Sequence, residues 1–244
     1  MTTLSQTTTN AHPLEWVAGV VFVIVLFFVL NYATPLILRA IQVRRWRSQR
    51  DVLALTYDDG PDSLSTGMLL DLLEELDVRA SFYLVGFRAD QNRDVLNRLV
   101  QSEHQLATHT HSHKNAWKKP FWFEFRDAMR GYTTLADVID QRAPYRPPFG
   151  KITMLTYLGM RLRGRAVHWW TIAARDTLDQ FDDVNSLAKR MLDEGERVVL
   201  MHCHHAETHR REYMLELTRA LVEQARERGI ALVTMHELGR GGVT

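Results

Sequence analysis

The sequence predicts an α/β domain, built as a distorted and incomplete (β/α)7 barrel, behind one N-terminal transmembrane helix. The first 40 residues contain a long apolar run without any charge, and from Val52 onward short apolar runs alternate with amphipathic helical patterns. Strands that alternate with helices indicate a parallel sheet with right-handed crossovers. About seven such units fit a barrel, and an open doubly wound sheet is the competing architecture.

The composition is ordinary for a globular protein, with 45% hydrophobic and 24% charged residues in 244. A chain of this length can bury a full core without disulfides. The formal net charge of +1 gives no general attraction for nucleic acid. The single cysteine, Cys203, excludes an intrachain disulfide. That fits a reducing compartment and does not exclude an exported protein.

The uncharged run covers residues 16–38 and follows an N-terminal tail of residues 1–15. At a rise of about 1.5 Å per residue it reaches roughly 35 Å, enough to cross the hydrocarbon core of a membrane. A cleaved signal peptide would carry positive charge before its apolar run, and the tail has no Lys or Arg. A buried core helix would show a polar face, and this run shows none. We therefore expect a transmembrane helix.

A basic juxtamembrane segment, residues 39–50, follows the run and carries five arginines with no acidic residue before Asp51. The positive-inside rule places this side in the cytoplasm, so we expect a single-pass protein of a bacterial inner membrane with its domain, residues 51–244, on the cytoplasmic side. The arginines could also contact anionic lipid headgroups, or could serve only to set the topology.

The expected strands are short apolar runs at 52–57, 80–85, 105–109, near Tyr145, and at 166–172, 197–201 and 230–234. Two helices are expected from apolar stripes, one around Leu69 to Leu76 and one around Leu217 to Ala225. Gly229 stands where the second helix should end.

Ionisable side chains follow the predicted strands. In parallel barrels the chemistry lies on loops after the C-terminal ends of the strands. The residues in these positions are Asp58, Asp59, His109, His113, Arg146, Asp176 and His202. Their gathering at one mouth is hard to explain by packing alone, so we expect the functional site there.

Three of these residues suit a metal ion. Adjacent carboxylates at Asp58 and Asp59 crowd like charge, which is costly without a compensating cation, although Asp-Gly is also a common turn. His109 and His113 are four residues apart, so both can bind one divalent ion. Two imidazoles and one carboxylate leave positions open for water and substrate, which is typical of catalytic rather than structural sites.

Four segments, TYDDGPD, HTHSH, RPPFG and LMH, resemble in order and spacing the motifs of the polysaccharide deacetylases, carbohydrate esterase family 4 with its NodB homology domain. The resemblance covers about residues 51–240. It implies a distorted (β/α) barrel and metal-dependent removal of an N-acyl group, most often N-acetyl, from an amino sugar. Zn²⁺ is the expected ion, with Co²⁺, Mn²⁺ or Ni²⁺ as alternatives.

The resemblance also implies residue roles. Asp58 would be the general base, His202 the general acid, and Asp59, His109 and His113 the metal ligands. Arg146 would orient Asp58, and Asp176 would tune the acidity of His202. The N–H of Phe149 would contact the oxyanion, and Leu200 would line the acyl pocket. The ion would polarise the amide carbonyl and lower the pKa of bound water toward about 7.

Some residues depart from the pattern or invite other interpretations. The family usually carries Trp after the acid, whereas Thr177 follows Asp176 here. His111 should point away from the ligand face. His205 and His209 could bind a second ion, but polar loop residues at the rim are the favoured interpretation. The aromatic residues of 117–125 fit core packing, or a lip that contacts membrane or sugar.

The predicted topology bears on the substrate. A cytoplasmic domain cannot reach an exported polymer, so we expect an N-acetyl or N-formyl group on a polyprenyl-phosphate-linked sugar in envelope or surface-glycan biosynthesis, with membrane lipids but no nucleic acid as further partners. One alternative is an exported deacetylase of peptidoglycan or chitin-type polymers with the anchor reversed. Another is a non-catalytic, membrane-tethered glycan-binding protein, which should have gaps in the catalytic set, and this sequence has none.

Overall fold

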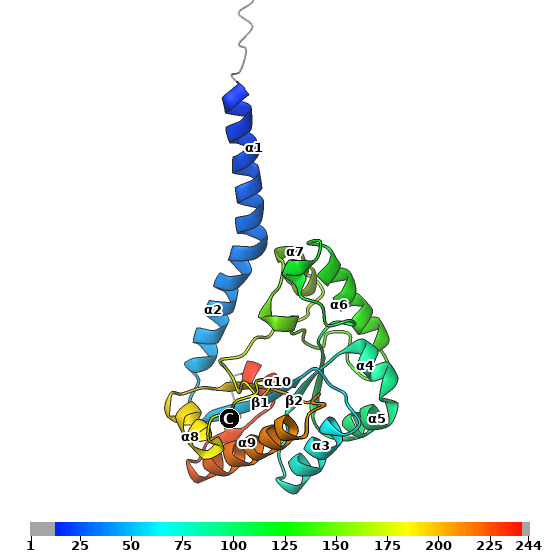
Figure 1. The fold of residues 1–244 in the computed structure, drawn as a ribbon, viewed down its shortest axis with the longest axis vertical. Helices are drawn as coiled ribbons and strands as arrows, with labels where there is room; N and C mark the ends of the chain where they lie inside the picture. The colour runs from blue at the N-terminus through cyan, green and yellow to red at the C-terminus, as the bar shows by residue number, and fades with distance from the viewer. Residues whose placement is uncertain (1–12, 241–244) are drawn as a thin grey trace, which may run out of the picture.

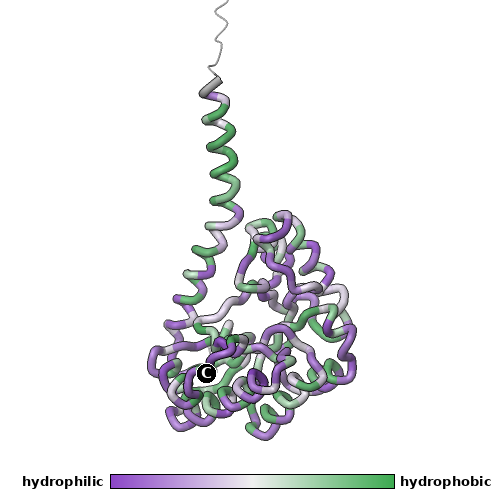
Figure 2. The backbone as a smooth tube through the Cα atoms, viewed as in Figure 1, coloured by the Kyte–Doolittle hydropathy of each residue, from purple (hydrophilic) through white to green (hydrophobic). Residues whose placement is uncertain are grey.

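A computed structural model describes residues 13–240, so most of the predicted N-terminal tail lies outside the described residues. One long helical rod stands on a rounded α/β domain (Figure 1). The rod consists of α1 (Pro13–Phe28), a π-helical turn (Val29–Ala33) and α2 (Thr34–Arg47). Figure 2 shows that apolar residues dominate α1, whereas hydrophilic and hydrophobic residues are mixed along the chain of the domain.

The domain is built on a parallel sheet with the order β3-β2-β1-β5-β4, and β6 pairs with the first residues of β1. The strands are β1 (Val52–Asp58), β2 (Ser81–Leu84), β3 (Gln105–Thr108), β4 (Ile172–Ala173), β5 (Val198–His202) and β6 (Ala231–Leu232). Every residue of β1 is buried, as expected of a central strand covered on both faces. The predicted parallel α/β fold is confirmed.

The predicted strand near Tyr145 is reduced to two isolated parallel bridges, one to Thr108 and one to Val167. The predicted strand at 166–172 is likewise only the bridge at Val167 and the two residues of β4. Residues 166–174 still connect the Tyr145 strand position to β5. Tyr145 N donates to Ala166 O at 2.8 Å, and Ala174 N donates to Leu200 O of β5 at 2.9 Å. The strand pairing thus continues round from β3 toward β4 through single bridges, and a closed barrel stays a prediction.

Helices cover the sheet: α3 (Ser65–Glu75), α4 (Gly86–Gln91), α5 (Arg93–Gln101), α6 (Phe123–Thr134), α7 (Met154–Arg161), α8 (Val184–Asp193), α9 (Thr208–Glu227) and α10 (Met235–Gly239). The two predicted apolar stripes are buried, on α3 and α9. Gly229, with φ 67°, follows α9 in the left-handed conformation that ends many helices.

Residues Glu15–Arg47 are long and apolar enough to cross a membrane by length and composition. The side chains from Val17 to Leu30 are exposed, so the domain does not cover them. The far end of the rod is different, because Trp46 is buried in the core and the Gln42 side chain donates to Val167 O at 2.8 Å and accepts from Trp169 N at 3.1 Å. The predicted juxtamembrane segment is therefore helical through Arg47 and packed on the domain.

Gly131 of α6 lies against the loop that carries the candidate histidines. A Cβ at this position would lie 2.7 Å from Thr108 Oγ1 and 2.8 Å from the carbonyl carbon of Thr110. We expect Gly131→Ala to destabilise the protein by about 1–3 kcal/mol through overpacking. Urea unfolding should show a lower midpoint for this variant than for Gly239→Ala, where a Cβ meets nothing within 4 Å. Equal midpoints for the two variants would contradict the tight contact.

Candidate active site

The register of the sheet brings the candidate residues together at the C-terminal ends of the strands. Asp58 and His202 are partners across the neighbouring strands β1 and β5. On the other side, Arg146 N donates to Thr108 O at 3.1 Å, which places Arg146 beside the end of β3. Asp59, His113 and Phe149 all have positive φ, between 51° and 72°. Backbone strain of this kind is concentrated at functional sites.

Asp59, His109 and His113 form a group whose ligand atoms all lie within 4.8 Å of one another. Asp59 Oδ1 lies 3.0 Å from His113 Nε2 and 3.6 Å from His109 Nε2. His109 donates through Nδ1 to Arg146 O at 2.7 Å, so Nε2 is left to face the group. A backbone partner on the second nitrogen is the usual arrangement of a metal-binding histidine.

The electrostatics of this group fit a divalent cation. Burial lowers the pKa of His109 to about 4, so this imidazole is neutral and can act as a ligand. Burial alone would raise the pKa of Asp59, but His113, His109 and His202 hold it well below its usual range. Asp59 Oδ1 is buried, and the basic groups nearest to it among the described residues are the two imidazole nitrogens, with His113 Nε2 at 3.0 Å and His109 Nε2 at 3.6 Å. A buried carboxylate oxygen beside two imidazole nitrogens is the donor set of a catalytic zinc site.

We expect Asp59→Asn to weaken zinc binding by more than the roughly 10–100-fold that loss of an outer-shell partner causes, because it removes the only charged ligand. Zinc titration of the purified full chain would measure this. His111→Gln is the matched control, because His111 turns away from the group and pairs through Nδ1 with Thr134 Oγ1 at 3.1 Å. Equal loss of zinc in both variants would contradict the assignment of ligands.

Asp58 is buried beside this group, with Oδ2 3.6 Å from His109 Nε2. Arg146 Nη1 donates to Asp58 Oδ1 and to Thr56 Oγ1, both at 2.8 Å, and Nη2 donates to Trp169 O at 2.9 Å. The guanidinium also lies 3.8 Å from the centre of the Tyr83 ring. The buried Arg146 guanidinium thus holds Asp58 in one orientation through Oδ1, and Oδ2 faces His109 of the candidate metal group.

His202, at the end of β5, is held by Asp176. His202 Nδ1 lies 2.9 Å from Asp176 Oδ1, and His202 N donates to Asp176 Oδ2 at 2.6 Å. Burial would lower the pKa of His202, but the hydrogen bond and charge of Asp176, with smaller effects of Asp59 and Asp58, raise it to about 9. The imidazole is therefore protonated at neutral pH, as a general acid requires.

The raised pKa of His202 predicts a pH dependence of stability in the metal-free protein. The folded pKa, about 9, lies above the ordinary value of 6.5. The stabilisation is therefore full below pH 6.5 and is lost as the pH rises through about 9. The difference in unfolding free energy between the wild type and His202→Gln, measured with chelator present, should shrink over this range. A difference that grew with pH would contradict the protonated pair.

Sequence reasoning missed His205. This residue is buried, which contradicts the prediction that it lies in a polar rim loop, and its Nε2 donates to Asp176 Oδ2 at 3.2 Å. Burial would raise the pKa of Asp176, but the hydrogen bonds of His202 and His205 lower it to about 2. His209 instead packs beside Phe181 and is exposed, so the two histidines do not act as a pair. No motif in the sequence distinguished His205 from its neighbours.

The other two predicted site residues are Phe149 and Leu200, and Trp169 and Cys203 lie in neighbouring segments. Phe149 is exposed and its ring centre lies 4.9 Å from that of His113. Leu200 is buried on β5, in register with Thr56. Trp169 is buried and donates through Nε1 to Gly150 O at 3.1 Å, so it supports the wall that holds Arg146. Cys203 is a free cysteine and is buried.

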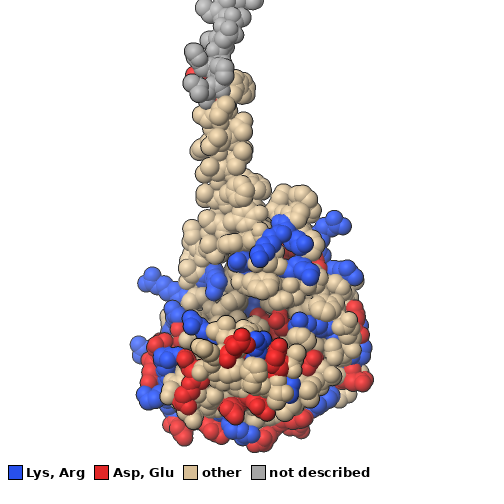
Figure 3. Space-filling model, viewed as in Figure 1, with Lys and Arg blue, Asp and Glu red and all other residues tan. Residues whose placement is uncertain are grey.

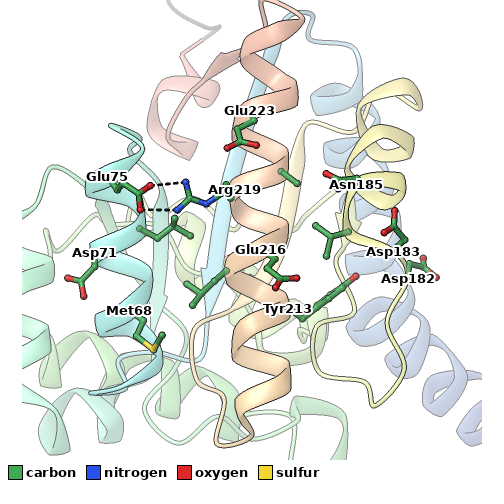
Figure 4. A pocket seen from close by; sticks show the side chains of 14 residues that line it. Met68, Asp71, Glu75, Asp182, Asp183, Asn185, Tyr213, Glu216, Arg219 and Glu223 are labelled. Carbon is green, nitrogen blue, oxygen red and sulfur yellow. Dashed lines mark hydrogen bonds and ion pairs between the residues drawn. The ribbon is translucent and has the colours of Figure 1, made fainter.

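A separate groove lies between α3, α8 and α9 and contains none of these residues (Figure 4). Its walls carry several carboxylates, and Arg219 forms an ion pair with Glu75 at 2.8 Å. The candidate active site is therefore the cluster at the strand ends rather than this groove between helices.

Comparison with known proteins supports this view. Residues 47–167 match the family model for polysaccharide deacetylases. A peptidoglycan-N-acetylglucosamine deacetylase of Bacillus cereus is 26% identical over 191 residues, which cover 78% of this chain and 88% of that protein. A second protein of that name and organism is 34% identical over 102 residues, which cover 41% of this chain and 37% of the relative. The peptidoglycan-N-acetylmuramic acid deacetylase PdaC of Bacillus subtilis is 25% identical over 158 residues, 62% of this chain and 32% of that protein.

Solved structures share the fold. The Bc1960 peptidoglycan N-acetylglucosamine deacetylase superposes with a TM-score of 0.70 at 22% identity, over 79% of this chain and 89% of that one. A family 4 carbohydrate esterase from Streptomyces lividans gives a TM-score of 0.66 at 20% identity, over 81% of this chain and 98% of the esterase. The family model, the curated relatives and the shared fold together support the assignment of this chain to the polysaccharide deacetylase family.

Proposed function

We propose that the chain is a metal-dependent hydrolase that removes an N-acyl group from an amino sugar, with N-acetyl as the favoured acyl group. The observation that carries the proposal is the arrangement of three candidate metal ligands beside a buried carboxylate, Asp58, which is in register with the imidazole of His202 on the neighbouring strand. The names of the curated relatives, which describe removal of acyl groups from N-acetylated sugars of peptidoglycan, favour the same reaction.

The proposed mechanism needs a base that accepts a proton from water and an acid that gives a proton to the leaving amine. Asp59, His109 and His113 would hold a divalent ion, with Zn²⁺ as the favoured one. An amide carbonyl is a poor electrophile, and the ion would act as a Lewis acid that polarises it. Asp58 accepts the proton of the attacking water, and Arg146 keeps the carboxylate in the orientation that this transfer requires.

The leaving amine needs a proton, and His202 supplies it, since the charge of Asp176 keeps the imidazole protonated near neutral pH. We further propose that the N–H of Phe149 stabilises the oxyanion and that Leu200 lines the acyl pocket.

The substrate depends on which side of the membrane the domain occupies. The arginines that follow the apolar run favour the cytoplasm and therefore a polyprenyl-phosphate-linked sugar. The curated relatives favour the other candidate, an exported enzyme that acts on peptidoglycan. A reporter fused after Thr244 decides the topology: activity only outside the membrane would contradict the cytoplasmic placement.

The function is tested by release of acetate or formate from the detergent-purified full chain supplied with zinc. The substrates are a polyprenyl-phosphate N-acetylated sugar, peptidoglycan and a chitooligosaccharide, each also offered to Asp58→Asn. Release from the lipid-linked sugar alone would support both the reaction and the cytoplasmic placement. Release from the polymers alone would support the reaction but contradict the cytoplasmic placement. Release from none of the substrates would contradict the proposed activity.

A further inference from the structure

The domain carries a second surface suited to a membrane, next to the apolar rod. We propose that this surface docks the domain onto the bilayer and binds anionic phospholipid headgroups, an inference that rests on the proposed transmembrane helix but not on the deacetylase reaction. We call it the interfacial patch. It is formed by the loop before α6, the start of α6, and α7, and its members are Trp117, Lys118, Lys119, Trp122, Arg126, Arg130, Leu155, Leu158, Arg161 and Leu162.

The interfacial patch lies where the rod would leave the membrane. The Tyr32 ring is 5.9 Å from the Trp117 ring, and the Phe27 ring is 5.4 Å from the Phe121 ring. In Figure 1, α7 lies beside the π-helical turn that joins α1 to α2, and the two elements are in contact. Tyr32 stands six residues before the end of the uncharged run, or about 9 Å along the helix. Interfacial segments are buried about 5–10 Å into the headgroup and acyl boundary, so side chains that touch Tyr32 lie at this depth.

Apolar side chains of the interfacial patch are exposed to an unusual degree. Leu158 is 51% exposed and Leu162, directly after α7, is 85% exposed, while Trp122 is 49% exposed. Leu155 lies three residues before Leu158 and on the same face of the helix. Exposed apolar patches mark surfaces that bind a protein or a membrane. Continuity with the apolar rod selects the membrane.

The charge around these apolar residues complements an anionic lipid surface. Residues 111–136 and 148–165 contain nine Lys or Arg and only two acidic residues, Glu124 and Asp127, both of which are buried. Figure 3 shows that Lys and Arg gather on the part of the domain nearest the rod, whereas Asp and Glu are more frequent at the opposite end. A hollow lined by Trp122, Phe123, Arg126, Asp127 and Arg130 lies within this region. Two guanidinium groups beside an aromatic ring suit a lipid phosphate.

The interfacial patch is connected to the rim of the active site. Trp117 donates through Nε1 to Ile152 O at 3.3 Å, and Lys151 Nζ lies 5.2 Å from the centre of the Trp117 ring. Residues 149–152 therefore join the interfacial patch to Phe149, which lies beside His113. Docking would hold the mouth of the site at the membrane surface, where a sugar carried on a lipid phosphate would be presented.

The test uses the full chain, one copy per nanodisc, with an environment-sensitive fluorophore on Leu158→Cys. Glu223→Cys on α9 is the matched control, and the buried native Cys203 does not compete. In discs that contain phosphatidylglycerol, we expect quenching by shallow nitroxide lipids to be several-fold stronger at position 158 than at 223, and quenching by aqueous iodide to be several-fold weaker. Discs of phosphatidylcholine alone, or the double variant Lys118→Gln/Lys119→Gln, should reduce the lipid quenching at 158.

Two results would overturn the docking, and a third would overturn its preference for anionic lipid. Equal quenching at positions 158 and 223 would show that the interfacial patch faces water. Protection from iodide without quenching by lipid nitroxides would show that protein rather than lipid covers it. Lipid quenching that is the same with and without phosphatidylglycerol would leave the contact with the bilayer but overturn the proposed binding of anionic headgroups. Acetate release by the same discs is measured separately, so failure of the docking is distinguishable from failure of the proposed reaction.

Discussion

Asp58→Asn is expected to lower turnover by about 10²–10⁴-fold, the range typical of a general base, while zinc binding is retained. The amide has nearly the shape of the carboxylate, and its oxygen can still accept from Arg146. It cannot take a proton from the attacking water. None of the three proposed metal ligands is changed, so the loss should appear in the rate and not in the metal content.

The matched control for this variant is Asp71→Asn, because Asp71 is an exposed acid on α3 that forms an ion pair with Arg98. Single-turnover acetate release would separate the chemical step from substrate binding. A near-normal rate for Asp58→Asn would remove Asp58 as the base. A variant that loses zinc together with activity would instead place Asp58 among the ligands.

The sequence predicted β1, β5 and the clustering of polar residues after them because these strands have strong local signals. Residues 52–57 form a mostly apolar run followed by the carboxylates Asp58 and Asp59, and residues 198–201 form another followed by the imidazole of His202. Parallel strands place these residues at the same edge of the sheet, and the observed strand order and register then make Asp58 and His202 neighbours. The pairing of His109 with His113 was predicted from their four-residue spacing on a helical turn together with the nearby carboxylates, since the spacing alone is weak evidence. The pairing is present, but the segment is a loop in which His113 has positive φ rather than a helical turn.

The region around Tyr145 could not be predicted in the same way. Its position depends on single bridges to Thr108 and Val167, which come from tertiary packing rather than from a run of strand-forming residues. The packing of α2 on the domain could not be predicted from the sequence either. Gln42 and Trp46 hold the rod on the domain through contacts more than 100 residues away in sequence, and no local pattern encodes such a pairing.

His205 shows a third kind of limit. Its neighbours His204 and His209 are of the same type and stand in the same loop and helix start, yet only His205 is buried against Asp176. Which of several histidines turns inward depends on how the chain leaves β5 and begins α9. A sequence offers the residue types but not that direction.

Arg146→Met is expected to lower the free energy of unfolding by about 3–5 kcal/mol, the cost of removing one partner from a buried ion pair. Arg146 is fully buried, and the substitution deletes the hydrogen bonds to Asp58, Thr56 and Trp169 O together. Methionine fills much of the volume and keeps contact with the Tyr83 ring. The loss therefore measures the uncompensated carboxylate of Asp58 rather than a cavity.

Urea unfolding with chelator present would measure this effect, because a bound cation could otherwise compensate the charge of Asp58. Arg142→Met, at an exposed position, should change stability by no more than about 0.5 kcal/mol. Arg146→Lys should recover part of the loss, since it restores the charge but not the planar donor that reaches Asp58 and Trp169 O at once. If Arg146→Met and Arg146→Lys were equally destabilised, the geometry of the guanidinium rather than its charge would hold the site. If neither variant lost stability, Asp58 would not depend on Arg146, and the orientation of the proposed base would need another source.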